Sequence, residues 1–403
     1  MNVVTVTYNM PPRLGGMAAH VWELNKALAG LGHKVRVLTA SDLYSAKRTV
    51  WKSDRVVEND GVQVFQFGAW GVFRHAQVQR KIAQWFRRNA LSGKDTIVHV
   101  HDLGAPSRVG KMTQLPMVWT NHSSPFLVAF ADVSSHSALA REIMPCTWVT
   151  APSVELLEKT VALGFPRERA TYIPNGVDVA RFLPRAEGEK AIRIGVQPLC
   201  FAEDTVVVTC ARRFVWKNGL HVLVDALTYI HGKWPRLNAV FLFAGNTELD
   251  TKREYGREIL GRLEGLRPKV RIHLLGEIPN DRMQELWAAT DICVLPSLLE
   301  ATSISGLEAM SCGVAVVGTN VGGIPEILRH EETGLLCPPN DAVSLAEQLM
   351  RLISNQALRK LFGAKARQRA VSEFAWRTIA ERFVTVYSKS IAVADGLSRL
   401  ERG

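Results

Sequence analysis

Several common catalytic motifs are missing from this chain of 403 residues. No G-x-G-x-x-G follows the first predicted strand, which argues against a dinucleotide site, and no G-x-x-x-x-G-K-[ST] is present, which disfavours a P-loop kinase or ATPase. The motifs G-x-S-x-G and H-E-x-x-H are also absent. No Asp-x-Asp occurs, which weakens the case for a divalent metal clamp on a diphosphate. Any phosphate must therefore be bound by main-chain amides and cationic side chains.

Cysteine and long apolar runs are also scarce. The six cysteines form no C-x-x-C pair, and most lie in apolar stretches, which predicts buried thiols in a reducing compartment rather than a zinc site or disulfide framework. No run approaches the ~18 uncharged apolar residues of a membrane-spanning helix. No basic segment precedes an apolar one at the N-terminus, so no secretory signal is predicted. We therefore expect a cytoplasmic protein.

Positive charge is concentrated in the first half of the chain. Residues 1–185 hold 22 Lys and Arg against 13 Asp and Glu, whereas residues 186–403 hold 27 against 25. The basic half is either a solvated surface or a surface for an anionic partner such as a phospholipid or a sugar phosphate. No RNA- or DNA-binding motif is present, so nucleic acid is not an expected partner.

Short β-branched runs alternate with helical stretches, which predicts two doubly wound α/β domains. The runs are nearly all apolar, as is typical of parallel strands covered on both faces. The polar stretch at 184–203, which contains two prolines, is the predicted linker. Two such domains would place a cleft at the carboxyl ends of both sheets. The predicted strands are residues 3–8, 34–39, 62–67, 96–101, 116–120, 147–150 and 170–173, then 205–211, 239–244, 270–275, 291–295 and 314–317.

Two loops at predicted strand ends could bind an anion. The loop 11–17 carries Gly15 and Gly16 directly before a helix, so its main chain and the helix N–H groups could approach a ligand closely. Arg212 and Lys217 follow the strand 205–211, where Arg could clamp a phosphate with two hydrogen bonds and Lys would act as a point charge. The alternative for the loop 11–17 is a plain turn between strand and helix. The alternative for the loop with Arg212 and Lys217 is a solvated loop without a ligand.

The segment 296–310 carries the strongest signal. Glu300 lies on a loop after an apolar strand, and Glu308 lies in the helix that follows. Thr302 and Ser303 are natural N-caps for that helix. The segment therefore presents one carboxylate on the loop, free helix amides, and a second carboxylate further along the helix. Carboxylates accept hydrogen bonds from vicinal hydroxyls of sugars and ribose, and amides bind hydroxyl or phosphate oxygens.

Taken together, these residues resemble the GT-B fold glycosyltransferases, in particular the large retaining group called family 4. The resemblance covers essentially the whole chain and implies two Rossmann-like domains at 1–185 and 186–374, of which the second binds the nucleotide sugar. The final helix, 375–403, would cross back to the first domain. Most of the motifs are weak singly, but their order and the Glu–Glu segment are specific. They are the glycine pair, the segments 32–35, 99–102, 118–122 and 173–178, Arg212 with Lys217, Glu300 with Glu308, and the segments 322–326, 333–339 and 374–376.

The resemblance also implies a role for each matching residue. Glu308 would bind the ribose hydroxyls of a nucleoside diphosphate sugar, and Glu300 would bind hydroxyls of the donor sugar. Arg212 and Lys217 would hold the diphosphate, while His122 would face the donor sugar and the reacting centre. The remaining implied residues are Gly15, Gly16, Ile278, Thr302, Ser303 and Ile304 for donor binding, with Ile278 at the nucleobase, and His101 and Asn175 on the acceptor side.

The implied reaction retains the anomeric configuration and needs neither a metal nor another cofactor. Two cations and helix amides would offset the negative charge that grows on the leaving diphosphate. The sequence shows no candidate for a nucleophilic carboxylate on the opposite face of the sugar. We therefore hypothesise front-face attack, in which the leaving phosphate takes the proton of the acceptor.

Two departures from the family pattern bear on specificity. Many members have Gly-Phe-Gly after the first glutamate, whereas residues 301–303 here are Ala-Thr-Ser, which narrows the pocket around the donor sugar. Arg13 stands where starch and glycogen synthases carry Lys, which argues against glucan synthesis. The alternatives left open are a glucan or disaccharide synthase with a soluble sugar acceptor, a nucleotide-sugar epimerase, and a non-catalytic nucleotide-sugar binding protein. A phosphorylase is disfavoured because no site for a pyridoxal-bearing lysine is visible.

Residues 72–90 predict a basic amphipathic helix. Ile82, Trp85 and Phe86 share one face, and arginines and lysines surround it. One interpretation is peripheral attachment to an anionic membrane that carries a lipid-linked acceptor, which would put the protein at the inner face of the membrane. The other is an outer helix that docks its apolar stripe on the sheet.

Overall fold

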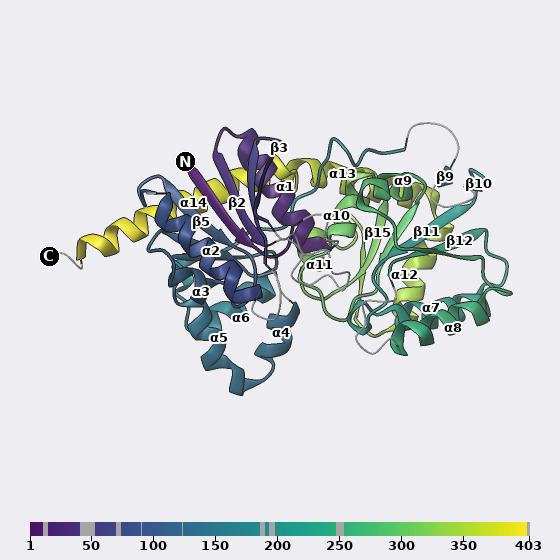
Figure 1. The fold of residues 1–403 in the computed structure, drawn as a ribbon. Coiled ribbons are helices and arrows are strands. Elements are labelled where there is room, and N and C mark those ends of the chain that lie inside the picture. The colour runs from purple at the N-terminus through teal and green to yellow at the C-terminus, as the bar shows by residue number, and fades with distance from the viewer. Residues whose placement is uncertain are drawn as a thin grey trace. The chain divides into compact units, whose positions relative to one another are not determined.

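The chain forms two compact units in the computed structural model (Figure 1). They are Met1–Gly176 with Trp376–Gly403, and Val177–Ala375. The division falls earlier than the predicted boundary after residue 185, and the predicted linker lies within the second unit. The structure describes residues 1–10, 15–40, 53–69, 74–89, 91–122, 124–185, 190–192, 198–246 and 254–400, with the side chains of 74, 124 and 397–400 left out.

An eight-stranded sheet forms the centre of the first unit, in the order β3-β4-β2-β1-β5-β6-β7-β8. Neighbouring strands are parallel except for β3, which runs antiparallel to β4. The strands are β1 (Asn2–Thr7), β2 (Lys34–Ala40), β3 (Arg55–Asn59), β4 (Val62–Phe67), β5 (Thr96–Val100), β6 (Met117–Thr120), β7 (Trp148–Ala151) and β8 (Ala170–Tyr172). The helices are α1 (Gly16–Gly30), α2 (Arg74–Arg88), α3 (Pro106–Gly110), α4 (Ser124–Phe130), α5 (His136–Ile143), α6 (Val154–Ala162) and α14 (Trp376–Leu400).

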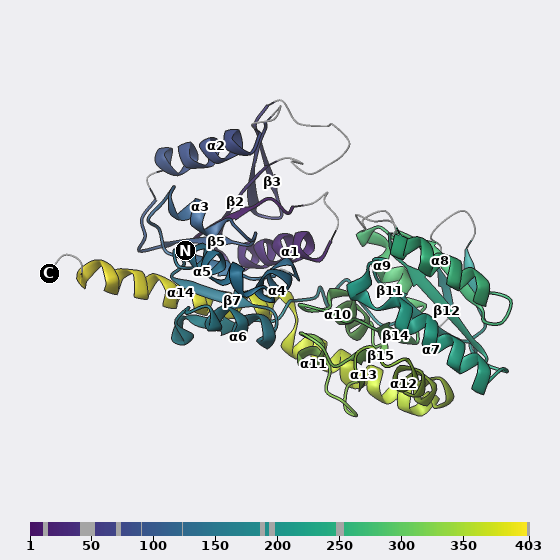
Figure 2. The ribbon, with the colours of Figure 1, turned by 90° about the horizontal axis from the view of Figure 1, so that it is seen from below.

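Helices cover both faces of this sheet, as alternate residues of one strand show. Val62 and Val64 of β4 belong to the core cluster that contains α1 and α14, whereas Phe65 lies against Trp85 of α2 with ring centroids 5.4 Å apart. Figure 2 shows α1 and α2 on different sides of the sheet. The period-2 geometry of a strand explains how one apolar run serves two helical layers.

A six-stranded, all-parallel sheet forms the centre of the second unit, in the order β13-β12-β11-β14-β15-β16. A separate antiparallel pair, β9 with β10, occupies part of the predicted linker. The strands are β9 (Lys190–Ile192), β10 (Leu199–Phe201), β11 (Val206–Ala211), β12 (Ala239–Ala244), β13 (Ile272–Gly276), β14 (Ile292–Leu295), β15 (Ala315–Thr319) and β16 (Leu335–Cys337). The helices are α7 (Leu220–Lys233), α8 (Glu254–Leu266), α9 (Met283–Ala288), α10 (Ile304–Ser311), α11 (Ile324–Ile327), α12 (Ala342–Ser354) and α13 (Gln356–Glu373).

Alternation along the strands again builds two helical layers. Val206 and Val208 of β11 pack in the cluster that includes α7, α8 and α12, while Val207 between them packs with α9. The two predicted doubly wound α/β domains are therefore confirmed. Five of the six cysteines are buried as predicted, and Cys200 is exposed.

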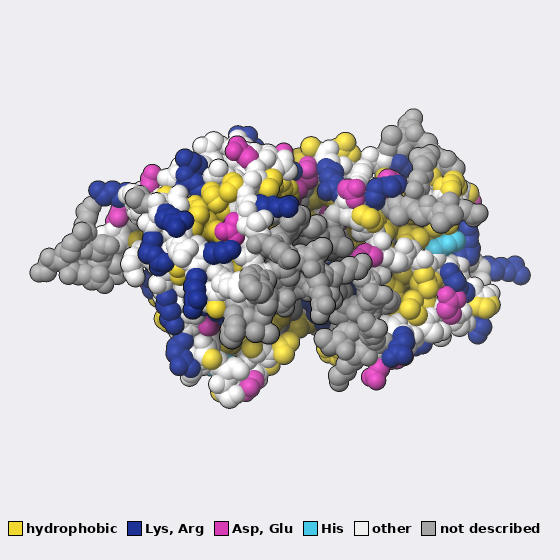
Figure 3. All heavy atoms as spheres, in the orientation of Figure 1, with side chains coloured by type: hydrophobic (Ala, Val, Ile, Leu, Met, Phe, Trp, Pro, Cys, Tyr) yellow, Lys and Arg dark blue, Asp and Glu magenta, His cyan; other side chains and the backbone are white. Residues whose placement is uncertain are grey.

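The helix α2 uses its apolar stripe to pack on the sheet. Ile82, Trp85 and Phe86 are all buried, so these side chains do not present a face to a membrane. Arg80, Arg87 and Arg88 of α2 are exposed, and Figure 3 shows Lys and Arg gathered over α2 and α3. None of the helices in the described part of the chain has the length and apolar content that a membrane crossing requires.

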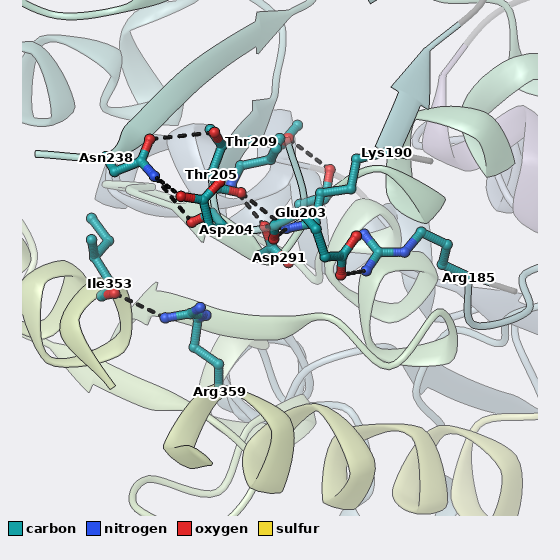
Figure 4. A network of polar contacts seen from close by, with 12 residues as sticks. Arg185, Lys190, Glu203, Asp204, Thr205, Thr209, Asn238, Asp291, Ile353 and Arg359 are labelled. Carbon is teal, nitrogen blue, oxygen red and sulfur yellow. Dashed lines mark hydrogen bonds and ion pairs between the residues drawn. The ribbon is translucent and has the colours of Figure 1, made fainter. Parts of the chain in front are cut away.

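The strands of the second sheet begin at a closed polar network (Figure 4). Lys190 of β9 donates from Nζ to the main-chain oxygens of Glu203 and Thr205 and to Asp291 Oδ2, each at 2.9 Å. The same Asp291 oxygen accepts the main-chain N–H of Val207 at 2.8 Å. This network fixes the amino ends of β11 and β14 to β9.

Candidate active site

Each sheet changes its winding direction beside its first strand. In the first unit β2 and β5 flank β1, and in the second unit β12 and β14 flank β11. Ligands in this architecture bind outside the carboxyl ends of the strands at such a switch point. Arg212 directly follows β11, and Ser297 and Glu300 follow β14, so they lie at the switch point of the second sheet.

The Arg212 guanidinium joins the two loops that meet there. Its Nη2 donates to Asn218 Oδ1 at 2.9 Å and to Ser297 Oγ at 3.0 Å, and it forms an ion pair with Glu300. Nη1 donates to Ser303 Oγ at 3.4 Å. The Nε–H of Arg212 is buried and has no hydrogen-bond partner within the described ranges. Burial lowers the pKa of Arg212 to about 10, so the guanidinium stays charged at neutral pH.

Lys217 lies on the same loop and ties it to the loop after β14. Its main-chain oxygen accepts the N–H groups of Leu298 at 2.8 Å and Leu299 at 3.1 Å. Gly219 lets the loops approach, because its φ of 66° is left-handed and a Cβ there would lie 1.8 Å from the Pro296 oxygen. Burial, and then the charge of Arg212, lower the pKa of the Lys217 ammonium to about 8.

The N-terminus of α10 adds main-chain donors beside these cations. The Ser303 side chain caps the helix by accepting the N–H of Gly306 at 3.1 Å. The Thr302 hydroxyl is buried and, in the described structure, makes no hydrogen bond. Gly322 packs directly against the main chain of this loop. Its φ is 52°, and a Cβ at this position would lie 1.6 Å from the main-chain oxygen of Glu300. The glycine pair at 322–323 therefore lets the main chain pack closely against residues 300–302.

Glu308 lies one helical turn further along, with a partly exposed side chain. Trp287 Nε1 donates to its Oε2 at 3.1 Å. Burial raises the pKa of Glu308 to about 7, against the opposing effects of the Trp287 hydrogen bond and the Arg181 charge. Ile278, the predicted nucleobase contact, packs its side chain in the core with Leu286, which leaves its main chain as the part that could meet a base.

The predicted residues of the first unit lie at the carboxyl edge of its sheet or beside it. Gly15 has a φ of 129° and precedes α1, which begins at Gly16. His101 follows β5 and is fully buried, and its Nδ1 lies 3.0 Å from Nε2 of the half-buried His122 after β6. Asn175 is buried beside His20 of α1 and influences the pKa of that histidine.

The structure thus brings several predicted residues together and adds others. Arg212, Glu300 and Ser303 share one hydrogen-bonded cluster, and His101 pairs with His122. Sequence reasoning did not single out the residues that orient them. A sequence signal existed only for Ser297, which follows the end of a predicted strand, and for His99, which lies in the segment 99–102 of the family pattern. The residues missed were Asn218, Trp287, Ser297, His20 and His99.

The cluster in the second unit is suited to binding an oxyanion next to a polyhydroxyl group. A charged guanidinium, an ammonium and the first N–H groups of α10 offer positive charge and donors. The carboxylates of Glu300 and Glu308 offer only acceptors when ionised, which hydroxyl groups satisfy.

Comparison with known proteins agrees, over both units, with the glycosyltransferase family that the sequence resembles. The family model described as Glycosyltransferase Family 4 matches residues 14–181, and the model described as Glycosyl transferases group 1 matches residues 196–369. The chain is 26% identical to N-acetyl-alpha-D-glucosaminyl L-malate synthase of Bacillus anthracis, over 93% of this chain and 94% of that protein. It is 25% identical to phosphatidyl-myo-inositol mannosyltransferase of Mycolicibacterium smegmatis, over 93% of this chain and 90% of that protein.

Solved structures share the fold. The Anabaena protein HepE, in complex with UDP-glucose, superposes with a TM-score of 0.72 at 19% identity, over 99% of this chain and 100% of that chain. This likeness confirms the predicted GT-B fold.

Proposed function

Because the chain belongs to glycosyltransferase family 4 and has the GT-B fold, we propose that it moves a sugar from a nucleoside diphosphate sugar to a hydroxyl acceptor, with retention of configuration and without a metal ion. The observation that carries this proposal is the Arg212 cluster at the switch point of the second sheet. A buried guanidinium keeps one N–H unpaired among the described residues, and the hydroxyl of Thr302, which precedes the Arg212 partner Ser303 in the chain, is unpaired in the same sense. Buried polar groups rarely stay unpaired, so a polar ligand is the expected partner.

Each part of the donor is bound by residues with complementary charge or hydrogen-bonding groups. Arg212 and Lys217 bind the diphosphate together with the amides that begin α10. Glu308 accepts hydrogen bonds from the ribose hydroxyls, and Glu300 accepts them from the donor sugar. The Arg212–Glu300 ion pair uses Oε2 of Glu300, and an ionised carboxylate has about four lone-pair positions. Glu300 can therefore orient Arg212 and still bind a hydroxyl.

Catalysis follows from the charge that develops on the leaving group. Cleavage of the bond from sugar to diphosphate places negative charge on the oxygens beside Arg212 and Lys217. One preorganised donor of this kind is typically worth ~3 kcal/mol of barrier. We propose front-face attack, in which the leaving phosphate oxygen accepts the proton of the acceptor hydroxyl. A covalent sugar–enzyme adduct trapped in a single turnover would refute this step.

The first unit contributes its own groups to the reaction. We propose that His122 contacts the donor sugar, that His101 and Asn175 serve the acceptor side, and that Gly15 and Gly16 offer main-chain N–H groups to an anion. The hydrogen bond between His101 Nδ1 and His122 Nε2 holds the His122 ring in one orientation.

The acceptor is proposed to be a hydroxyl compound that also carries negative charge. L-malate and phosphatidyl-myo-inositol, which appear in the names of two similar proteins, are both of this kind. A cytoplasmic enzyme could meet a lipid-linked acceptor through the exposed basic side of α2, where Arg80, Arg87 and Arg88 project. Binding to anionic vesicles should then weaken as salt is added. Binding that is absent, or unchanged by salt, would exclude this attachment.

One assay tests the proposal as a whole. The protein is incubated in EDTA with UDP-, GDP- and ADP-linked sugars, and release of the nucleoside diphosphate is followed. We expect slow donor hydrolysis for one nucleotide, faster turnover when an acceptor is present, and a product with the anomeric configuration of the donor. Conversion of the donor into an epimer without acceptor would indicate an epimerase, and binding without any turnover would indicate a non-catalytic binding protein.

A further inference from the structure

Four imidazoles gather at the carboxyl edge of the first sheet. His99 is in β5, His101 follows that strand, His122 follows β6, and His20 reaches them from α1. We propose that His20, His101 and His122 form a binding site for a divalent transition metal ion of the zinc class. One nitrogen from each of these three rings lies within 4.8 Å of the corresponding nitrogens of the other two.

The spacing is close to what a tetrahedral ion requires. Zinc–nitrogen bonds of about 2.0–2.1 Å place two ligand nitrogens about 3.3 Å apart. His101 Nδ1 and His122 Nε2 are 3.0 Å apart, and the ring centroids of His20 and His122 are 4.3 Å apart. The three nitrogens, which lie within 4.8 Å of one another, would converge on one ion by rotation of the side chains.

His99, the fourth imidazole, differs from the three proposed ligands in its hydrogen bonds. Both nitrogens of His99 are paired, Nδ1 with the Tyr387 hydroxyl at 2.7 Å and Nε2 with the Thr120 hydroxyl at 2.6 Å. In contrast, both nitrogens of His20 and Nε2 of His101 are buried and make no hydrogen bond of good geometry among the described residues, although the Asn175 side chain lies near enough to His20 to raise its pKa. A buried polar group left unpaired costs about 1–3 kcal/mol, so the cluster has bonding capacity that the protein does not use.

The protonation state also suits a metal. Burial lowers the pKa of His20 to about 3 and lowers the pKa of His101 and His122 well below the ordinary value. Burial therefore favours the neutral form of all three rings, which is the form that binds metal. Imidazole ligands favour zinc, copper, nickel and iron over magnesium or calcium.

The surroundings define what else the ion would bind. Trp376 and Phe383 pack around His20, and Asp102 is engaged by Tyr8 and Asn9, so the ligand set contains no carboxylate from the described residues. The half-buried His122 marks the side that is open to solvent. Three neutral imidazoles and one solvent-derived ligand are a coordination known for zinc in enzymes.

A metal at this site would withdraw His122 from the transfer reaction. This consequence rests on the proposed function, in which His122 contacts the donor sugar. Coordination of the ion by His122 Nε2 replaces the hydrogen bond with His101 that orients the ring, so zinc is expected to inhibit transfer and a chelator to restore it. The site is thus a point of control by zinc that is built from residues of the first unit alone.

Titration of the full chain with Co²⁺, a coloured substitute for zinc, tests the site without any turnover. We expect one equivalent to bind with the visible absorption of a four-coordinate site, and Zn²⁺ to displace it. The variants His20→Leu and His122→Asn should each weaken binding at least tenfold. His136→Gln, which changes a histidine of α5 outside the cluster, should bind as the wild type does.

Each outcome decides the proposal. Saturable binding that both cluster variants lose supports the site, and His122→Asn alone decides it if His20→Leu does not fold. No saturable binding to the folded wild-type chain, or equal binding by the two cluster variants and the wild type, overturns it. If Co²⁺ binds at the cluster but zinc leaves turnover unchanged, the metal site stands and the role of His122 in transfer fails.

Discussion

The two edges of the second sheet hold buried cations in opposite ways. At the amino edge the Lys190 ammonium has three N–H donors and donates to three acceptors of the protein, each at 2.9 Å (Figure 4). At the carboxyl edge Arg212 has four protein partners and still keeps a buried Nε–H without one, in the part of the chain that the structure describes. The first edge is complete by itself, whereas the second has hydrogen-bonding capacity left over for a ligand.

The difference separates stability from function within one sheet. A closed network of buried charges contributes to the fold only as long as every member is present. An open network costs stability in the absence of a ligand and repays it when a ligand binds. Substitutions at the two edges should therefore affect different measurements.

Loss of the amino-edge cation should have the largest effect on stability. Lys190→Met removes a buried ammonium and its three hydrogen bonds and leaves the partly buried Asp291 without its ion-pair partner, so the free energy of unfolding should fall by about 3 kcal/mol. Transfer activity per folded molecule should stay the same. Chemical denaturation measures the first quantity and a transfer assay measures the second. The double variant Lys190→Met/Asp291→Asn should recover part of the loss, and a loss of activity at full stability would remove the distinction between the edges.

Replacement of the carboxyl-edge cation should show the reverse pattern. Arg212→Lys keeps the charge but loses the planar fork, so kcat/KM should fall by about 10²–10³-fold while the unfolding free energy changes far less than in Lys190→Met. Arg213→Lys, an exposed neighbour, is the matched control and should behave like the wild type. Wild-type activity in Arg212→Lys would contradict the role given to the diphosphate cluster.

The pH dependence should reflect two shifted groups of the free protein. Glu308, whose pKa burial raises to about 7, must be ionised to accept ribose hydroxyls, so kcat/KM for the donor should fall about tenfold per pH unit below 7. Lys217, whose pKa is lowered to about 8, loses its charge above that pH, which gives a second decline.

Two variants test which residue causes the decline of kcat/KM at low pH (the acid limb) and at high pH (the alkaline limb). Glu308→Gln should lower activity and abolish the acid limb, and Lys217→Arg should move the alkaline limb to higher pH. An acid limb that persists in Glu308→Gln would assign it to another group.

The smallest effect is expected for the unpaired hydroxyl. Thr302→Val removes a buried group that has no hydrogen-bond partner among the described residues, so the unfolding free energy should stay equal or rise slightly. Donor affinity should fall about 2–10-fold, which calorimetry can measure, if the hydroxyl meets the ligand. Lower stability with unchanged affinity would show that the hydroxyl serves the fold instead.

Much of the fold could be predicted from the sequence because buried parallel strands are nearly continuous apolar runs. The strands β4 and β12 have the predicted bounds, and most others differ by one or two residues. The strand β3 was missed because all five of its residues are exposed, so no apolar pattern marks it. Similarly, β9 and β10 are only three residues each and lie in a stretch that is polar overall.

The site was predictable as far as it follows strand ends. Arg212 and Glu300 stand next to apolar runs, and their type suggests the chemistry. Trp287 could not be found in this way, because its hydrogen bond to Glu308 depends on how α9 packs beside α10. His20 lies inside a helix, and only the fold places it against His122, which is remote in sequence. The apolar stripe of residues 72–90 fits a membrane or a core equally well, and the structure assigns its described apolar residues to the core.

Binding of the donor to the second unit without a metal is the claim that most needs a direct measurement. Calorimetric titration with the nucleotide sugar selected from the panel should give the same affinity in EDTA as in Mg²⁺, for the wild type and for the folded fraction of Lys190→Met. The same titration of Arg212→Lys should show a large loss of affinity in both buffers. Binding that requires Mg²⁺, or that survives the Arg212 substitution, would contradict the account.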